Sequence, residues 1–134
     1  MKIEVSNGEL IDKLSILDVK SEMVKDEQKL VNINKEKEIL NDCFQTLLSE
    51  VDPDMKLKLL DFYLELIAVN KKLWDIEDDL RKKEIKREFG FHFVELARSV
   101  YYTNDKRADI KREINNLTNS DLIEEKEYKD YRKK

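Results

Sequence analysis

Apolar residues recur every three or four positions along most of this chain, the spacing that places side chains on one face of an α-helix. In the clearest series the steps alternate strictly between four and three residues; its members are Met55, Leu59, Phe62, Leu66, Val69, Leu73, Ile76 and Leu80. This alternation is typical of knobs-into-holes packing between long helices. The pattern therefore predicts an all-α protein with coiled-coil-like contacts.

Related series predict three long helices, at about residues 7–51, 53–88 and 91–117. Short connections favour antiparallel neighbours, so we expect an antiparallel three-helix bundle. In the first helix, Asp26 and Lys37 fall on positions that the apolar series would otherwise occupy. The series stays in phase across them, and we predict one continuous helix there.

Local signals support these boundaries. Ser6 and Glu9 have the spacing of a capping box at the start of the first helix. Asp52 is placed to cap the second helix, and Pro53 fits its first turn. Gly90 indicates a turn before the third helix, with a kinked continuous helix as the alternative.

Two short segments flank the three helices. Residues 2–5 alternate between polar and apolar side chains and predict an extended N-terminal arm. Residues 122–131 are interpreted as a short C-terminal helix. No repeat or linker divides the chain, so residues 1–134 are expected to form a single helical domain.

Composition agrees with long amphipathic helices. Of the 134 residues, 42% are charged and 40% hydrophobic, with two glycines and one proline. The net charge of −4 argues against nucleic acid as a partner. The densest basic group, within residues 81–87, is interpreted as a solvated helix end. No apolar stretch reaches membrane-spanning length or resembles a signal peptide, so we expect a cytoplasmic protein.

A polar row runs beside the apolar series of the second helix and faces a polar stretch of the third helix in the expected hairpin. Together they form the candidate site: Asn70, Trp74, Glu77, Asp78, Arg81, Arg98, Tyr101, Asn104, Asp105 and Arg107. Counting from the turn places Asn70 near Arg107. The start of the first helix, including Asp12, is expected near residues 84–95 instead.

Two interpretations of this set remain open. In the first, its members satisfy one another and fix the register of the bundle, as buried polar residues do in coiled coils. In the second, they line a pocket in which arginines bind an anionic group, an aromatic ring stacks on a flat ligand, and Asn and Asp bind hydroxyls.

Signals for catalysis are weak. His92 is the only histidine and lies in an aromatic cluster, and the chain has no Gly-rich phosphate loop or nucleophile elbow. No spacing typical of a metal site stands out. We therefore expect no catalytic residues, no metal and no cofactor, and we favour a protein that is not an enzyme.

The chain resembles a small bacterial family of uncharacterised all-helical proteins. The resemblance lies in residues 8–17, in Asn70 with residues 73–78 and Arg81, in residues 96–101, 103–107 and 110–115, and in residues 120–131. It covers nearly the whole chain except about residues 25–60. It implies a context near glycosyltransferase and surface-polysaccharide genes, and it assigns no catalytic residue.

These observations predict a non-enzymatic interaction or scaffold protein. Its apolar series exceed what three unequal helices can cover, so we expect a homo-oligomer, with a dimer favoured, or binding to another protein. One alternative is a nucleotide or sugar-phosphate binding protein with its site between the second and third helices. A helical-hairpin RNA binder is the third hypothesis, which the acidic balance disfavours.

Overall fold

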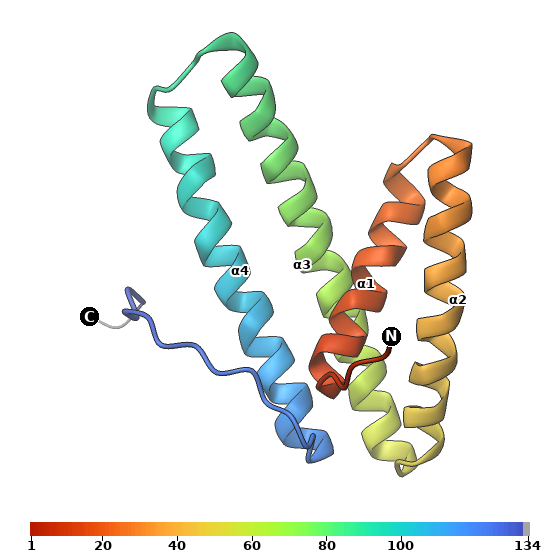
Figure 1. Ribbon diagram of the computed structural model, residues 1–134. Helices are drawn as coiled ribbons and strands as arrows, with labels where there is room; N and C mark the ends of the chain where they lie inside the picture. The colour runs from red at the N-terminus through yellow and green to blue at the C-terminus, as the bar shows by residue number, and fades with distance from the viewer. Residues whose placement is uncertain (133–134) are drawn as a thin grey trace.

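Two helical hairpins joined in a V make up the protein, as seen in a computed structural model that describes residues 1–132 (Figure 1). The first hairpin is α1 (Asn7–Met23) with α2 (Glu27–Ser49), and the second is α3 (Pro53–Lys86) with α4 (Phe91–Thr118). No strand occurs in residues 1–132. The all-α prediction is confirmed, whereas the predicted count of three helices is wrong.

The difference arises because the predicted helix at 7–51 is two helices. Val24 leaves the helical region with φ −80° and ψ 133°, and the Asp26 side chain accepts a hydrogen bond from the Lys29 amide at 2.9 Å. Asp26 therefore starts a new helix by satisfying one of its free amides. This break lets α2 fold back on α1, where Lys37 forms an ion pair with Asp18.

The second hairpin follows the predicted boundaries closely. Asp52 accepts a hydrogen bond from the Met55 amide at 2.8 Å, and Pro53 occupies the first turn of α3. A turn, not a kink, separates α3 from α4. The left-handed residue that ends α3 is Arg87, with φ 54°, whereas Gly90 has φ −82° and precedes α4.

Both terminal segments differ from the sequence prediction. Residues 121–132 form an extended segment that runs back beside α4 (Figure 1), not a helix. An extended chain advances about 3.3 Å per residue and a helix about 1.5 Å, so only the extended form reaches from the end of α4 back to Tyr101. At the N-terminus, Ile3 and Val5 form no strand and are exposed.

The hydrophobic core lies where the two hairpins meet, which we call the vertex. Its buried members are Ile11, Leu14, Phe44, Leu48, Leu59, Leu66, Val69, Leu73, Ile110 and Ile114. Residues 77–102, which we call the arm, form the far end of the α3–α4 hairpin and contain no buried residue. The core therefore orders the vertex and leaves the arm projecting from it.

Candidate functional site

A buried carboxylate at the vertex organises the polar residues of the protein. The side chain of Asp12, on α1, is 0% exposed. Arg107, on α4, donates from Nε to both carboxylate oxygens at 2.9 and 3.0 Å, and from Nη2 to Oδ2 at 2.5 Å. The hydrogen bonds to Asp12 raise the pKa of Arg107. This pair ties α1 to α4 through a charge-assisted, forked contact.

Asn70 connects the same carboxylate to α3. Its Nδ2 donates to Asp12 Oδ1 at 3.0 Å and to Ser15 Oγ at 2.8 Å. The Ser15 hydroxyl in turn donates to the main-chain oxygen of Asp12 at 2.6 Å. Asn70 and Ser15 are both buried. Three helices therefore meet at one hydrogen-bonded network.

Lys111 extends this network toward solvent. Its Nζ lies 3.9 Å from Asp12 Oδ2 and donates to Glu9 at 2.7 Å and to Glu124 at 2.9 Å. Burial acts to lower the pKa of Lys111, but the hydrogen bonds to Glu9 and Glu124 raise it by more, and the net direction is upward. We call Asp12, Ser15, Asn70, Arg107 and Lys111 the polar cluster.

Gly8 allows the close approach of α1 to α4 that this network requires. Its amide donates to Asn115 Oδ1 at 2.7 Å. A Cβ added at Gly8 would lie 2.5 Å from the main-chain oxygen of Lys111. Any side chain at this position would therefore push the two helices apart.

The structure brings two residues of the predicted site, Asn70 and Arg107, together on Asp12. Exposure increases along the rest of the polar row of α3, away from Asp12. Trp74 is half-buried, whereas Glu77 and Arg81 are exposed on the arm. Asp78, also exposed, lies 3.6 Å from Lys82.

The α4 members of the predicted site divide in the same way. Asp105 is buried and accepts a hydrogen bond from the Tyr128 hydroxyl at 2.8 Å. Burial raises the pKa of Asp105, but the hydroxyls of Tyr131 and Tyr128 that face it lower it by more. The Tyr131 hydroxyl is buried and lacks a hydrogen-bond partner of good geometry. Tyr101 contacts the Tyr131 ring, with the two centroids 4.9 Å apart.

Two further members of the predicted site lie outside the polar cluster. Arg98 is exposed and donates to Glu95 one turn away at 3.0 Å. Asn104 is half-buried. The ten predicted residues therefore do not surround one common cavity.

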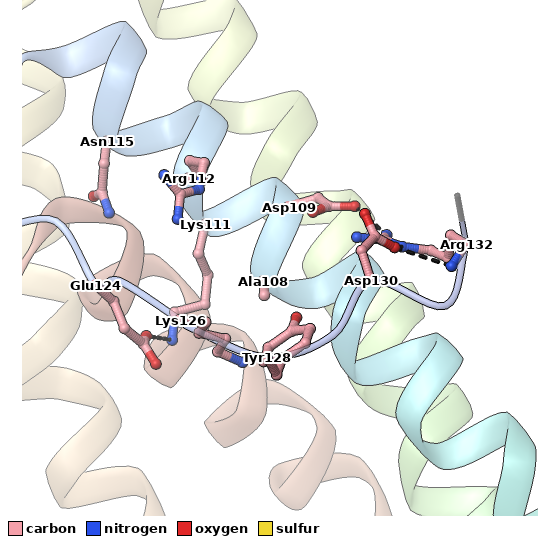
Figure 2. A pocket seen from close by; sticks show the side chains of 10 residues that line it. All are labelled: Ala108, Asp109, Lys111, Arg112, Asn115, Glu124, Lys126, Tyr128, Asp130 and Arg132. Atoms are coloured by element: carbon pink, nitrogen blue, oxygen red, sulfur yellow. Dashed lines mark hydrogen bonds and ion pairs between the residues drawn. The ribbon is translucent and has the colours of Figure 1, made fainter. Parts of the chain in front are cut away.

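A groove between α4 and the extended C-terminal segment lies beside the polar cluster and has a volume of about 420 Å³ (Figure 2). Its lining residues are Ala108, Asp109, Lys111, Arg112, Asn115, Glu124, Lys126, Tyr128, Asp130 and Arg132. Figure 2 shows Lys111 directed at Glu124, and Arg132 directed at Asp109 and Asp130. Most of its cations are therefore already paired with carboxylates.

Sequence reasoning missed Asp12, Ser15 and Lys111 because it placed the start of α1 at the wrong end of the bundle. The break at Asp26 reverses the chain early and brings Asp12 beside Arg107. One signal was available: residues 8–17 and 110–115, which carry Asp12 and Lys111, are both segments of the family resemblance.

The polar groups around Asp12 are directed at one another. The Asp12 carboxylate is enclosed by its own partners, so no open face is left for a substrate. Among residues 1–132, no group of three His, Cys, Asp or Glu side chains is arranged to hold a metal ion. Within the same residues, no helix combines the length and apolarity needed to cross a bilayer.

No curated protein and no solved structure matches the chain. The family comparison does give a match, and it extends over residues 1–132, which include the polar cluster, the groove and the arm. The chain therefore belongs to a protein family described as a family of unknown function, DUF6165.

Proposed function

We propose that the protein is a non-enzymatic helical interaction protein that assembles with a second copy of itself through α3. The observation that carries this proposal is an exposed apolar row on that helix. Leu57 and Leu64, seven residues apart, are 63% and 62% exposed. Leu60 and Ile67 lie between and beyond them and are half-buried. We call these four residues the α3 row.

The α3 row has the geometry of an unfilled helix-packing seam. Positions separated by three, four and seven residues lie on one stripe of a helix. The opposite stripe of α3, with Leu59, Leu66 and Leu73, is buried in the core. A helix with two apolar stripes packs on two neighbours. Within residues 1–132, Leu60 packs against the edge of the core, whereas Leu57 and Leu64 remain exposed and lack a second neighbour.

The charges beside the row favour a second copy in antiparallel orientation. Asp61 and Lys72 lie along the same side of the row, are exposed, and form no ion pair within residues 1–132. Antiparallel overlap of two rows about a twofold axis would place Asp61 of each copy opposite Lys72 of the other. It would also place Leu64 against Ile67 near the axis.

The test is the mass of the protein in solution. We expect sedimentation equilibrium to give a dimer for the unchanged protein and a monomer for Leu64→Glu, with equal helix content by circular dichroism. Val31→Glu is the matched control, because Val31 is 61% exposed on α2 and lies outside the row. A monomer at every concentration of the unchanged protein would overturn the proposal.

Charge reversal tests the orientation of the two copies. Asp61→Lys should weaken the dimer, since two lysines would then face each other. Adding Lys72→Asp to that variant should restore it. If the double variant stays as weak as the single one, the antiparallel arrangement is wrong even where the dimer itself is present.

The groove of Figure 2 supports a second candidate function, the binding of a small anion such as a sugar phosphate. The observation in its favour is Lys126, which lines the groove without a carboxylate partner in residues 1–132. Trp74 does not line the groove, so binding should be followed by calorimetry and not by tryptophan fluorescence. Absence of heat with glucose 1-phosphate, or equal heat with Lys126→Glu, would remove this candidate.

A further inference from the structure

Large apolar side chains are exposed together at the end of the arm. Ile85 is 82% exposed and Phe91 is 74% exposed, and Phe89 and Val94 are also exposed. All four lie within ten residues of chain around the turn between α3 and α4 (Figure 1). We call them the tip surface. A cluster of this kind at the end of a projecting hairpin contributes nothing to the core and marks a contact surface.

The end of the arm is also positively charged on an acidic protein. Residues 81–94 contain five basic and two acidic side chains, a net charge of +3, whereas the whole chain carries −4. The remainder therefore carries −7. Lys83 is paired with Glu88 at 3.0 Å, and Lys82 lies 3.6 Å from Asp78. Lys86 forms no ion pair with any residue in 1–132 and is free to meet an external anion.

A hollow beside the tip surface is lined by three lysines and three carboxylates. It lies between the end of α3 and the start of α4 and has a volume of about 580 Å³. Its lining residues are Asp79, Lys82, Lys83, Lys86, Glu88, His92, Glu95 and Leu96. Lys82 and Lys83 are paired with carboxylates, so Lys86 is the lysine of this hollow that has no ion pair within residues 1–132 and could meet a lipid phosphate.

We propose that the tip surface docks on the headgroup region of an anionic lipid bilayer. Phe91, Phe89, Ile85 and Val94 enter the boundary between headgroups and acyl chains, to the depth of about 5–10 Å that is typical of interfacial segments. Lys86 and its neighbours in the hollow contact lipid phosphates. The attachment is peripheral, because the protein lies on the surface and does not span it.

Charge and shape both favour a bilayer over other partners. The acidic remainder of the chain is repelled by an anionic surface while the basic tip is attracted, so the arm is oriented end-on. Nucleic acid would also attract the lysines, but the aliphatic side chains of Ile85 and Val94 gain nothing from base stacking. They gain free energy on leaving water for an acyl environment.

Vesicle flotation tests the proposal. The unchanged full chain should float with vesicles of phosphatidylglycerol and phosphatidylcholine, and it should stay behind with phosphatidylcholine alone. Phe91→Ser should lower partitioning about tenfold, because the burial of one aromatic side chain is lost. Lys86→Glu should lower it by a similar factor, because it removes one attraction and adds one repulsion.

Matched controls lie elsewhere on the molecule. Leu64→Ser removes a comparably exposed apolar side chain from the α3 row, and Lys129→Glu reverses an exposed lysine of the C-terminal segment. Both should float like the unchanged protein. Equal flotation of Phe91→Ser and the unchanged protein would overturn the proposal, as would retention by single-stranded RNA in place of vesicles.

The same variants separate this inference from self-association. Phe91→Ser should keep the mass of the unchanged protein, whereas the α3-row variant Leu64→Glu should lose the dimer and still float. If Phe91→Ser dissociates a dimer that Leu64→Glu leaves intact, the tip surface is an interface between copies and not a bilayer contact.

Discussion

The vertex and the arm of this protein share α3 and α4, yet the burial of polar and apolar side chains differs between them. At the vertex, a charged aspartate is fully buried and the apolar residues around it are enclosed. On the arm, residues 77–102 contain no buried side chain, and Ile85 and Phe91 are among the most exposed apolar residues of the chain.

We interpret this difference as a division between the vertex, which holds the shape, and the arm, which we propose docks on a bilayer. Asp12 joins α1, α3 and α4 through Asn70 and Arg107. A buried hydrogen-bonded network of this kind fixes the orientation of the two hairpins relative to each other. On the arm, charged side chains keep the helices soluble while the apolar ones remain available. Asn70 and Arg107, which suggested a binding site in the sequence, thus serve the architecture, whereas the contact surfaces that we propose are apolar.

The largest expected effect is at the vertex. Asp12→Ala leaves the Arg107 guanidinium without its carboxylate, and the free energy of unfolding should fall by about 3–5 kcal/mol. Urea unfolding followed by circular dichroism measures this change. Asp78→Ala on the arm is the control, where we expect a change within about 0.5 kcal/mol. Similar values for the two variants would show that the polar cluster does not hold the hairpins.

Replacement of each of the two glycines by alanine should lower the free energy of unfolding by less than Asp12→Ala does. Gly8→Ala places a Cβ against the main-chain oxygen of Lys111 and should cost about 1–3 kcal/mol through displacement of α1. A Cβ at Gly90 on the arm would meet nothing within 4 Å, so Gly90→Ala should cost no more than about 1 kcal/mol, from the poorer N-cap residue alone. The same unfolding measurement applies. A neutral Gly8→Ala would mean that α1 is free to shift at the vertex.

The packing of the C-terminal segment on α4 should depend on pH. The hydrogen bond from Lys111 lowers the pKa of Glu124 below its ordinary 4.5. Because the pKa of Glu124 is lower in the docked state, its ionised form stabilises the packing of the C-terminal segment on α4. This stabilisation is fully present above about pH 4.5 and is lost as the pH falls through the lowered pKa. Asp105, whose pKa is also lowered, should behave in the same way.

NMR chemical shifts of residues 121–132 should therefore move toward their unfolded values as the pH falls from about 6 to about 3. Tyr128→Phe removes the hydrogen bond to Asp105 and should produce part of this change already at the higher pH. Backbone shifts that stay the same at the two pH values would contradict the role of these carboxylates in docking the segment.

The smallest effect on stability is expected on the arm. Phe91→Ser and Ile85→Ser remove exposed side chains and should change the free energy of unfolding by no more than about 0.5 kcal/mol, while altering lipid binding. A loss of several kcal/mol in urea unfolding would show that these residues belong to a core, which would remove the contrast between arm and vertex.

The sequence predicted best what local interactions decide. The boundaries of α3 and α4 follow from Asp52, Pro53 and Gly90, whose effects on the backbone extend over one turn. The break near Asp26 was missed because a capping aspartate competes with a continuous helix only when the new helix can fold back on a partner. The extended C-terminal segment was missed because its contacts, such as Tyr128 with Asp105, are to another element.

The candidate site shows the same limit. Counting residues along one hairpin was sufficient to place Asn70 near Arg107, and in the structure both side chains donate hydrogen bonds to Asp12. Asp12 itself could not be placed, since its position depends on the break in a different hairpin. Exposed members such as Glu77 and Arg81 share the helical row of Asn70 but lie beyond the vertex. Periodicity gives the direction of a side chain and not the extent of the core.

Hydrogen exchange of the whole protein, with and without anionic vesicles, tests the central claim most directly. We predict slow exchange at the vertex, in residues 66–76 and 103–115, and faster exchange across 77–102, with vesicles adding protection near residues 85–94 alone. Uniform protection along α3 and α4 without vesicles, or vesicle protection centred on the vertex, would contradict the division into a structural vertex and a lipid-binding arm.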